Sequence, residues 1–376
     1  MDYKIWLSPP HLGGNELKYI QDAFESNWIA PVGPNIDALQ RDLCLFTGSK
    51  YALAVSSGTA AIHLALQVLG VQRDDIVLCQ SLTFVASANP ILYLQAVPVF
   101  IDSEAETWNM CPEALETAIR HYIRLGKKPK AVMLVHLYGM PAKLKEIIMI
   151  CSRYDIPLIE DAAEALGSSY QRHSLGTLGY MGVFSFNGNK IITTSGGGAL
   201  LCQRLDYMQK ARFLASQAKD YAPHYEHSEI GYNYLMSNIC AGIGRGQMEV
   251  LEARVEKRRF NFELYKNQLM NIPGISFQKE PAGAFSNRWL TTIVFDPKTS
   301  GILPQALRTM FEEQRTETRP VWKPMHLQPL FKDAEYFGGD VAQRIFSAGI
   351  CLPSGSTLDK QDINNICECI IKAGKN

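Results

Sequence analysis

The fold of this chain is decided first by residues 52–69, which read ALAVSSGTAAIHLALQVL. A short apolar run, Ala52 to Val55, ends in small hydroxyl residues and leads directly into Thr59 to Leu69, whose apolar spacing is typical of an amphipathic helix. A strand that passes through a short turn into a helix is the repeating unit of a parallel sheet covered by helices. The stretch therefore predicts an α/β fold.

The same alternation continues as far as residue 202. Further strands are predicted at Ile76 to Cys79, Val97 to Ile101, Ala131 to Leu137, Pro157 to Glu160, Val183 to Phe186 and Gly198 to Cys202. Helices are predicted between them at Val85 to Leu94, Pro112 to Leu125, Ala142 to Tyr154 and Arg204 to Gln217. We therefore expect a mostly parallel central sheet in an α/β/α large domain.

Beyond Gly242 the pattern changes, and one long charged helix is predicted through Glu249 and Arg258 to about Met270. We place a domain boundary on this helix, which gives a large domain of residues 1–250 and a small C-terminal α+β domain of residues 251–376. The small domain is expected to hold a strand at Trp289 to Phe295 and helices at Pro304 to Gln314 and Asp362 to Lys372.

Composition excludes several classes of partner. Lys plus Arg and Asp plus Glu number 37 each, so no overall charge favours nucleic acid or an anionic membrane. No apolar run approaches the roughly 18 residues of a membrane span, and Met1 to Pro10 lacks the apolar core of a secretory signal, which predicts a cytoplasmic protein. The nine cysteines show no CxxC spacing, so neither a disulfide framework nor a metal site is expected.

Three stretches could carry chemistry. Ser57, Gly58, Thr59 and Ala60 form a helix start that suits a phosphate, although an ordinary helix cap explains them equally well. Asp161 ends an apolar strand, at the edge where open α/β sheets bind ligands, but it could also be a capping residue. Lys190 lies in a locally uncharged turn before three glycines, where burial could make its amine nucleophilic.

Together these stretches meet the needs of one cofactor. Pyridoxal 5'-phosphate requires a phosphate cradle, an acid that keeps its pyridine nitrogen protonated and a lysine that holds its aldehyde. Ser57 to Ala60, Asp161 and Lys190 supply a candidate for each need in turn. A nicotinamide dehydrogenase would instead need a GxGxxG turn between a strand and a helix, and the glycine run here precedes a strand.

At these residues the chain resembles the DegT/DnrJ/EryC1/StrS family of sugar aminotransferases, which have the fold of type I pyridoxal phosphate enzymes. The likeness covers nearly the whole chain. It is carried by the stretches Pro9 to Gly14, Trp28 to Pro34, Ser56 to Ala61, Leu82 to Asn89, Glu160 to Ala165, Phe184 to Phe186 with Lys190, Gly231 to Ser237 and His326 to Leu330.

The resemblance implies a role for each matching residue. Lys190 would form the Schiff base, Asp161 would pair with the ring nitrogen, and Phe84 would stack on the ring unless it is a core aromatic. Thr59, Ala60 and Ser185 would bind the phosphate. Asn233 would reach the phosphate site of the neighbouring subunit, which implies a homodimer with shared active sites.

Glu164 departs from the His or Gln that family members often carry beside the ring hydroxyl. An ionised carboxylate would repel a phenolate-like oxygen there. Glu164 is therefore protonated, or bonded through water, or turned toward the substrate or the other subunit.

The segment Asn187 to Gly198 resembles members that act on UDP-linked 4-keto-6-deoxy-N-acetylhexosamines. It implies that L-glutamate donates an amine to the C4 keto group of the sugar, for glycan biosynthesis. Transfer to C3 of a dTDP- or UDP-keto sugar stays open, as does a non-catalytic protein on this scaffold. A relative that deoxygenates or dehydrates sugars would carry His in place of Lys190. The candidate substrate contacts are Arg319, Trp322, His326, Lys323, Lys219, Arg212 and Tyr234.

Overall fold

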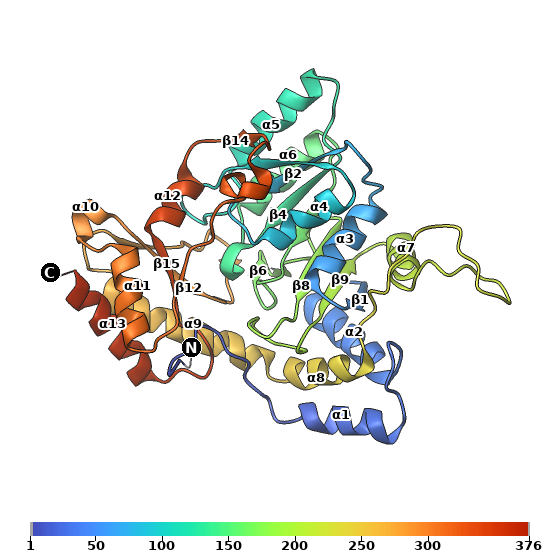
Figure 1. Ribbon diagram of the computed structural model, residues 1–376, viewed down its shortest axis with the longest axis horizontal. Coiled ribbons are helices and arrows are strands. Elements are labelled where there is room, and N and C mark those ends of the chain that lie inside the picture. The colour runs from blue at the N-terminus through green and yellow to red at the C-terminus, as the bar shows by residue number, and fades with distance from the viewer. Residues whose placement is uncertain (1–2, 375–376) are drawn as a thin grey trace.

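The computed structural model describes residues 3–374, which form an eight-stranded sheet and a four-stranded sheet, each packed with helices, and a three-stranded sheet (Figure 1). The larger sheet has eight strands in the order β1-β9-β8-β5-β4-β2-β3-β14. These strands are β1 (Tyr51–Val55), β2 (Ile76–Gln80), β3 (Val97–Ile101), β4 (Ala131–Val135), β5 (Leu158–Asp161), β8 (Met181–Ser185), β9 (Gly198–Cys202) and β14 (Tyr336–Phe337). Only β9 runs antiparallel to its neighbours, so the predicted mostly parallel sheet is confirmed.

Helices cover both faces of this sheet because its strand residues are apolar and alternate between the faces. Leu78 and Leu134 pack on one face, while their neighbours Val77 and Met133 pack on the other. The first face is covered by α2 (Pro34–Thr47), α5 (Pro112–Arg124) and α6 (Leu144–Arg153). The second is covered by α3 (Gly58–Val68), α4 (Asn89–Tyr93) and α7 (Leu205–Ala215).

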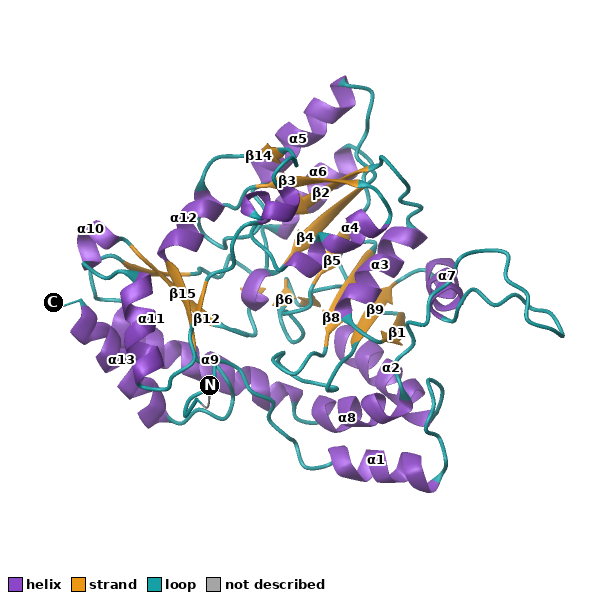
Figure 2. Ribbon diagram, viewed as in Figure 1, coloured by secondary structure: helices purple, strands orange, loops and turns teal. Residues whose placement is uncertain are grey.

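The smaller sheet has the order β10-β12-β15-β13, and Figure 2 shows its strands as a separate group beside the larger sheet. Its strands are β10 (Ile275–Phe277), β12 (Thr291–Phe295), β13 (Arg319–Pro320) and β15 (Gly349–Leu352). Apolar residues of this sheet pack against α9 (Leu251–Leu269), α11 (Pro304–Glu313) and α13 (Lys360–Ala373). The large sheet also takes β14 from the C-terminal part, and the boundary near residue 250 stays a prediction.

The remaining elements are short or peripheral. The helix α1 (Glu16–Glu25) packs on α8 (Asn238–Met248), and a second small sheet joins β6 (Ser169–Tyr170), β7 (His173–Ser174) and β11 (Ala284–Phe285). The others are α10 (Pro297–Ser300), α12 (Val341–Ala348) and the 3-10 turns η1 (Val85–Ser87), η2 (Leu137–Gly139), η3 (Met325–Leu327) and η4 (Pro329–Phe331). Within residues 3–374, no helix is long and apolar enough to cross a bilayer.

For three elements, the predicted ends or continuity were wrong. The strand expected to reach Leu137 ends at Val135, because Tyr138 adopts a left-handed φ of 57° inside η2. The helix expected over residues 85–94 is divided into η1 and α4, and Pro90 stands in the first turn of α4, where its missing N–H costs no hydrogen bond. The single long helix is interrupted between α8 and α9, since Val250 has a non-helical ψ of 5°.

Candidate active site

Strand register brings the predicted site segments to one edge of the large sheet. Val55 at the end of β1 and Ser185 at the end of β8 both pair with Gly198, the first residue of β9. Asp161 at the end of β5 pairs with Val183, one strand further along. A Cβ added to Gly198 would lie 2.5 Å from the backbone nitrogen of Gly58, so only glycine lets β9 approach the start of α3 this closely.

The N-terminus of α3 provides hydrogen-bond donors at this edge. Ser57 caps the helix, because its side-chain oxygen accepts a bond from Ala60 N (3.0 Å) while its carbonyl accepts one from Ala61 N (3.1 Å). The first four N–H groups of a helix have no partner within the helix, and this cap leaves those of Gly58 and Thr59 for a ligand. Amides at the positive end of the helix dipole form a site for an anion.

Asp161 is buried, and both of its carboxylate oxygens accept hydrogen bonds. Its Oδ1 accepts from Ala163 N (3.1 Å) and its Oδ2 accepts from Ser87 Oγ (2.6 Å). The single hydroxyl hydrogen of Ser87 is used in that bond, so Thr83 Oγ1, 2.7 Å from Ser87 Oγ, must be the donor to Ser87. Two buried hydroxyls therefore hold the orientation of the carboxylate.

Lys190 projects from the turn between β8 and β9, and its side chain is 12% exposed. Its Nζ lies 3.4 Å from Glu164 Oε1 and 4.3 Å from the centre of the Trp289 ring. The backbone N–H of Lys190 donates to Asn187 O (3.0 Å), which tightens the turn. The amine is therefore held in a mostly buried position between a carboxylate and an aromatic face.

Glu164 is buried beside Lys190, and its Oε2 accepts a hydrogen bond from the backbone N–H of Tyr138 (2.6 Å). Burial raises the pKa of this carboxyl to about 7, although the Lys190 charge and the Tyr138 N–H act in the opposite direction. Glu164 can therefore exchange a proton near neutral pH.

These groups line one cavity of about 680 Å³, between the edge of the large sheet and the segment that follows the small-sheet strand β13. The predicted site residues that line it are Ser57, Gly58, Thr59, Phe84, Asp161, Glu164, Ser185, Lys190, Arg319, Trp322 and Lys323. Phe84 is 53% exposed, which fits a ring awaiting a stacking partner better than a core aromatic. Its ring centre lies 5.6 Å from that of Trp322.

Other predicted residues lie outside the cavity lining. His326 stacks on Tyr336 with 3.8 Å between ring centres and lies 2.7 Å from Ser81 Oγ through Nδ1, as a structural histidine does. Asn233 is exposed and is not among the residues that line the cavity of its own chain. The remaining residues outside the lining are Ala60, which is buried in α3, and Tyr234, Arg212 and Lys219.

Sequence reasoning missed several residues of this site. Thr83 and Ser87 carried no clear signal, because small hydroxyl residues are common in turns and the helix predicted here begins only at Val85. Trp289 carried no usable signal, since an aromatic residue at the start of a predicted strand is ordinary core. The structure places its ring against Lys190 all the same.

The cavity fits pyridoxal phosphate in the chemistry of its donors. The cavity reaches the start of α3, where Gly58 and Thr59 offer backbone amides and Ser57 and Ser185 offer hydroxyls to a dianionic phosphate. Asp161 offers a buried carboxylate for a protonated ring nitrogen, and Lys190 offers an amine for the aldehyde.

Comparison with known proteins places these residues in a family. The family model described as the DegT/DnrJ/EryC1/StrS aminotransferase family matches residues 10–371. The Bacillus subtilis (strain 168) protein named "Putative pyridoxal phosphate-dependent aminotransferase EpsN" is 53% identical over 99% of this chain and 96% of that protein. The GDP-perosamine synthase of Vibrio cholerae is 34% identical over 96% of each chain. The solved aminotransferase TlmJ of Streptoalloteichus hindustanus is 28% identical, with a TM-score of 0.90 over 99% of this chain and 98% of that one.

Proposed function

Because the chain belongs to the DegT/DnrJ/EryC1/StrS aminotransferase family, and is thus a pyridoxal-phosphate-dependent sugar aminotransferase, we propose a specific reaction for it. It transfers an amino group from L-glutamate to the 4-keto group of a nucleotide-linked keto-deoxy sugar. The proposed acceptor is UDP-4-keto-6-deoxy-N-acetylglucosamine, and the product is a 4-amino sugar for glycan biosynthesis.

One observation carries the amino-transfer chemistry of this proposal: a lysine amine, a buried acid and a helix N-terminus meet around a single cavity of about 680 Å³. Pyridoxal phosphate, when bound, supplies an electron sink that stabilises negative charge on the carbon that loses its proton. The amides of Gly58 and Thr59 would hold its phosphate. Asp161 would hold a proton on the ring nitrogen, and Phe84 would cover one face of the ring.

Lys190 has two tasks in this proposal. Its Nζ would hold the aldehyde of the cofactor, and its free amine would move the proton that the donor carbon loses. Glu164 lies 3.4 Å from Nζ and can take up or return the second proton of the amine, because burial brings the pKa of Glu164 close to neutrality.

The nucleotide would meet positive charge at the opening of the cavity. Arg319 and Lys323 both line it and suit the diphosphate of a nucleotide sugar. Arg319 is bonded through Nη2 to Glu317 Oε1 (2.6 Å), an arrangement that aims the guanidinium but offsets part of its charge. Trp322 offers an aromatic face to the sugar or the base.

A second acceptor is supported by the relatives. The Vibrio cholerae relative is named GDP-perosamine synthase, and a protein of the same name from Escherichia coli O157:H7 is also 34% identical over 96% of each chain. A GDP-linked keto sugar is therefore the alternative to the UDP-linked one. Transfer to C3 is the remaining alternative in regiochemistry.

The first experiment is an absorbance spectrum of the purified protein and of Lys190→Ala, each with and without L-glutamate. The wild-type protein is expected to show the visible band of lysine-bound cofactor, which L-glutamate bleaches, and the variant is expected to lack this response. A wild-type protein that stays colourless after incubation with pyridoxal phosphate would contradict the assignment of Lys190.

The glutamate-treated enzyme is then offered UDP- and GDP-linked 4-keto-6-deoxy sugars separately. Return of the visible band identifies the acceptor, and NMR of the product locates the new amine. A visible band that returns only with the GDP sugar, or an amine at C3, would overturn the proposed substrate while leaving the family assignment intact.

A further inference from the structure

The turn that carries Lys190 is fixed by the carbonyl of the preceding residue. Asn189 O accepts two hydrogen bonds, from Ser8 Oγ (2.7 Å) and from the indole Nε1 of Trp289 (2.8 Å). One donor belongs to the N-terminal segment and the other to the segment that enters the small sheet at β12. Parts of the chain far apart in sequence therefore converge on the peptide beside the lysine.

A buried arginine of α9 anchors the backbone of Trp289. Arg258 Nη1 donates to Trp289 O (2.5 Å) and Arg258 Nη2 donates to Ser8 Oγ (2.9 Å). Because Ser8 and Trp289 both donate to Asn189 O, these groups form a closed ring of hydrogen bonds. Each member restrains the others, so the plane of the indole is set by the tertiary structure.

The backbone of Glu164, whose carboxylate lies opposite the indole, is tied to the same segment. Asn287 Oδ1 accepts from Trp289 N (2.9 Å), and Asn287 Nδ2 donates to Glu164 O (2.8 Å). Glu164 and Trp289 are thereby held at a set separation, with Lys190 Nζ 3.4 Å from the carboxylate and 4.3 Å from the ring centre.

We propose that Trp289 is a positioning residue whose indole face holds the free Lys190 ammonium opposite Glu164, and so sets the place from which the amine attacks and to which it returns. The negative face of an aromatic ring attracts a cation, most strongly for tryptophan. The inference rests on the cofactor chemistry of Lys190 and is independent of which sugar is used.

The consequence concerns the pH at which the lysine can react. Lys190 attacks the cofactor aldehyde as the neutral amine: the C–N bond forms, the amine gives up its protons, and the aldehyde oxygen leaves as water. A partner that stabilises the ammonium form reduces the amount of neutral amine, so a higher pH is needed for attachment. Removing the aromatic face should therefore move attachment to lower pH.

The test is the rate at which the visible band grows when pyridoxal phosphate is added to the cofactor-free full-length protein, followed against pH. Trp289→Leu is expected to lower the pH of half-maximal rate by about half a unit or more, and Trp289→Phe by less. Both variants lose the Nε1 hydrogen bond, so the difference between them isolates the ring face. Trp6→Leu, which alters an exposed tryptophan outside the cavity lining, should leave this pH unchanged.

Equal shifts in the Leu and Phe variants, or no shift in either, would overturn the proposal. Trp289 is buried, and if its variants do not fold, fluorinated tryptophans replace it without a change of shape. The pH of half-maximal rate should then fall stepwise with the number of fluorine atoms, and a constant value would again overturn the proposal. Failure of the wild-type protein to form the band would count against the assignment of Lys190 instead.

Discussion

Glu164 shows how one residue combines burial, charge and a reactive neighbour. It is 5% exposed, accepts the Tyr138 N–H and lies beside Lys190. Among the alternatives that the sequence left open, the structure favours a carboxyl that is partly protonated at neutral pH, because burial raises its pKa to about 7. Such a group could donate a hydrogen bond to the cofactor's ring oxygen instead of repelling it.

The raised pKa of Glu164 predicts a pH-dependent stability. Its stabilising contribution is fully present below pH 4.5, the ordinary value, and is lost as the pH rises through about 7. The loss is on the order of 3 kcal/mol over that range. Glu164→Gln keeps an acceptor for Tyr138 N–H, so denaturation of the cofactor-free variant should show a shallower fall between pH 5 and 8. Curves that run parallel to wild type would contradict this.

The hydroxyl pair behind Asp161 gives a second prediction at this scale. Thr83→Val removes the donor to Ser87 without changing the volume of the side chain, while Thr83→Ser retains the hydroxyl. The Val variant is expected to bind pyridoxal phosphate about fivefold more weakly, as the loss of about 1 kcal/mol implies, and the Ser variant near normally. Equilibrium titration of cofactor fluorescence measures both. Equal affinities would show that the Thr83 hydroxyl does not support Asp161.

Among the elements, the helix α3 contributes both to the core of the protein and to the cavity. Its apolar side chains pack against the sheet, with Ile62 and Leu64 fully or almost fully buried, while its first turn faces the cavity. Register through β9 brings this turn beside Ser185 of β8. The position of the helix therefore depends on the reversed strand, which a strand-and-helix pattern alone does not specify.

Two substitutions at Ser57 should separate the cap from the phosphate site. Ser57→Ala removes the bond from Ala60 N and is expected to lower the free energy of unfolding by about 1 kcal/mol. Ser57→Asp preserves the cap but adds a negative charge, so the cofactor-free variant should keep its stability and lose at least about tenfold in cofactor affinity. Thermal melts and cofactor titrations test the pair. Normal cofactor binding by the Asp variant would place the phosphate elsewhere.

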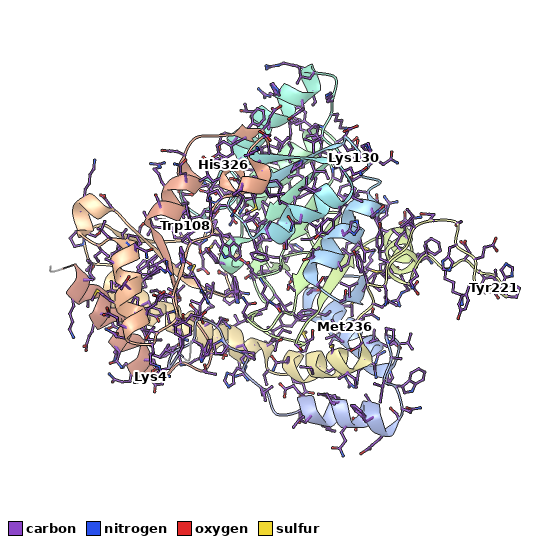
Figure 3. All side chains as sticks on the ribbon, in the orientation of Figure 1. Lys4, Trp108, Lys130, Tyr221, Met236 and His326 are labelled. Carbon is purple, nitrogen blue, oxygen red and sulfur yellow. The ribbon has the colours of Figure 1, made fainter. Side chains whose placement is uncertain are left out.

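At the scale of the whole molecule, the loop after α7 extends away from the body and carries Tyr221 near its tip (Figure 3). Tyr221, Tyr225 and Ile230 are exposed there, and Trp28 and Val32 expose further apolar surface. Exposed apolar side chains of this kind suit a contact with a second subunit. They would suit the homodimer that the resemblance implies, in which we propose that Asn233, next to this loop, reaches the partner's site.

Mixing two inactive variants tests whether the sites are shared. Asn233→Ala and Lys190→Ala are each expected to lower activity strongly. If Asn233 serves the partner's site, a mixed dimer contains one complete site, so equal mixing after dissociation should restore about a quarter of wild-type activity. The refolded single variants are the controls. No recovery, with mixed dimers verified by mass spectrometry, would place Asn233 in its own chain's site or outside any site.

The alternation of strands and helices, and with it the α/β class, could be predicted from the sequence. The sequence also indicated the local settings of Ser57, Asp161 and Lys190, because each lies directly after a strand or within a turn whose composition is readable nearby. It could not determine the ends of elements such as the strand at Val135, where a left-handed residue inside a buried turn overrode strand propensity.

The tertiary structure alone decided which distant residues surround the amine. In the sequence, Trp289 looks like an ordinary core aromatic and Arg258 looks like a solvated charge on a helix. In the structure both are buried, and both help to fix the turn that carries Lys190. Their contacts depend on the packing of the small sheet and α9 against the lysine turn. Sequence patterns within one helix or strand reflect the structure of that element alone. Which other element a side chain contacts is decided only when the elements pack together.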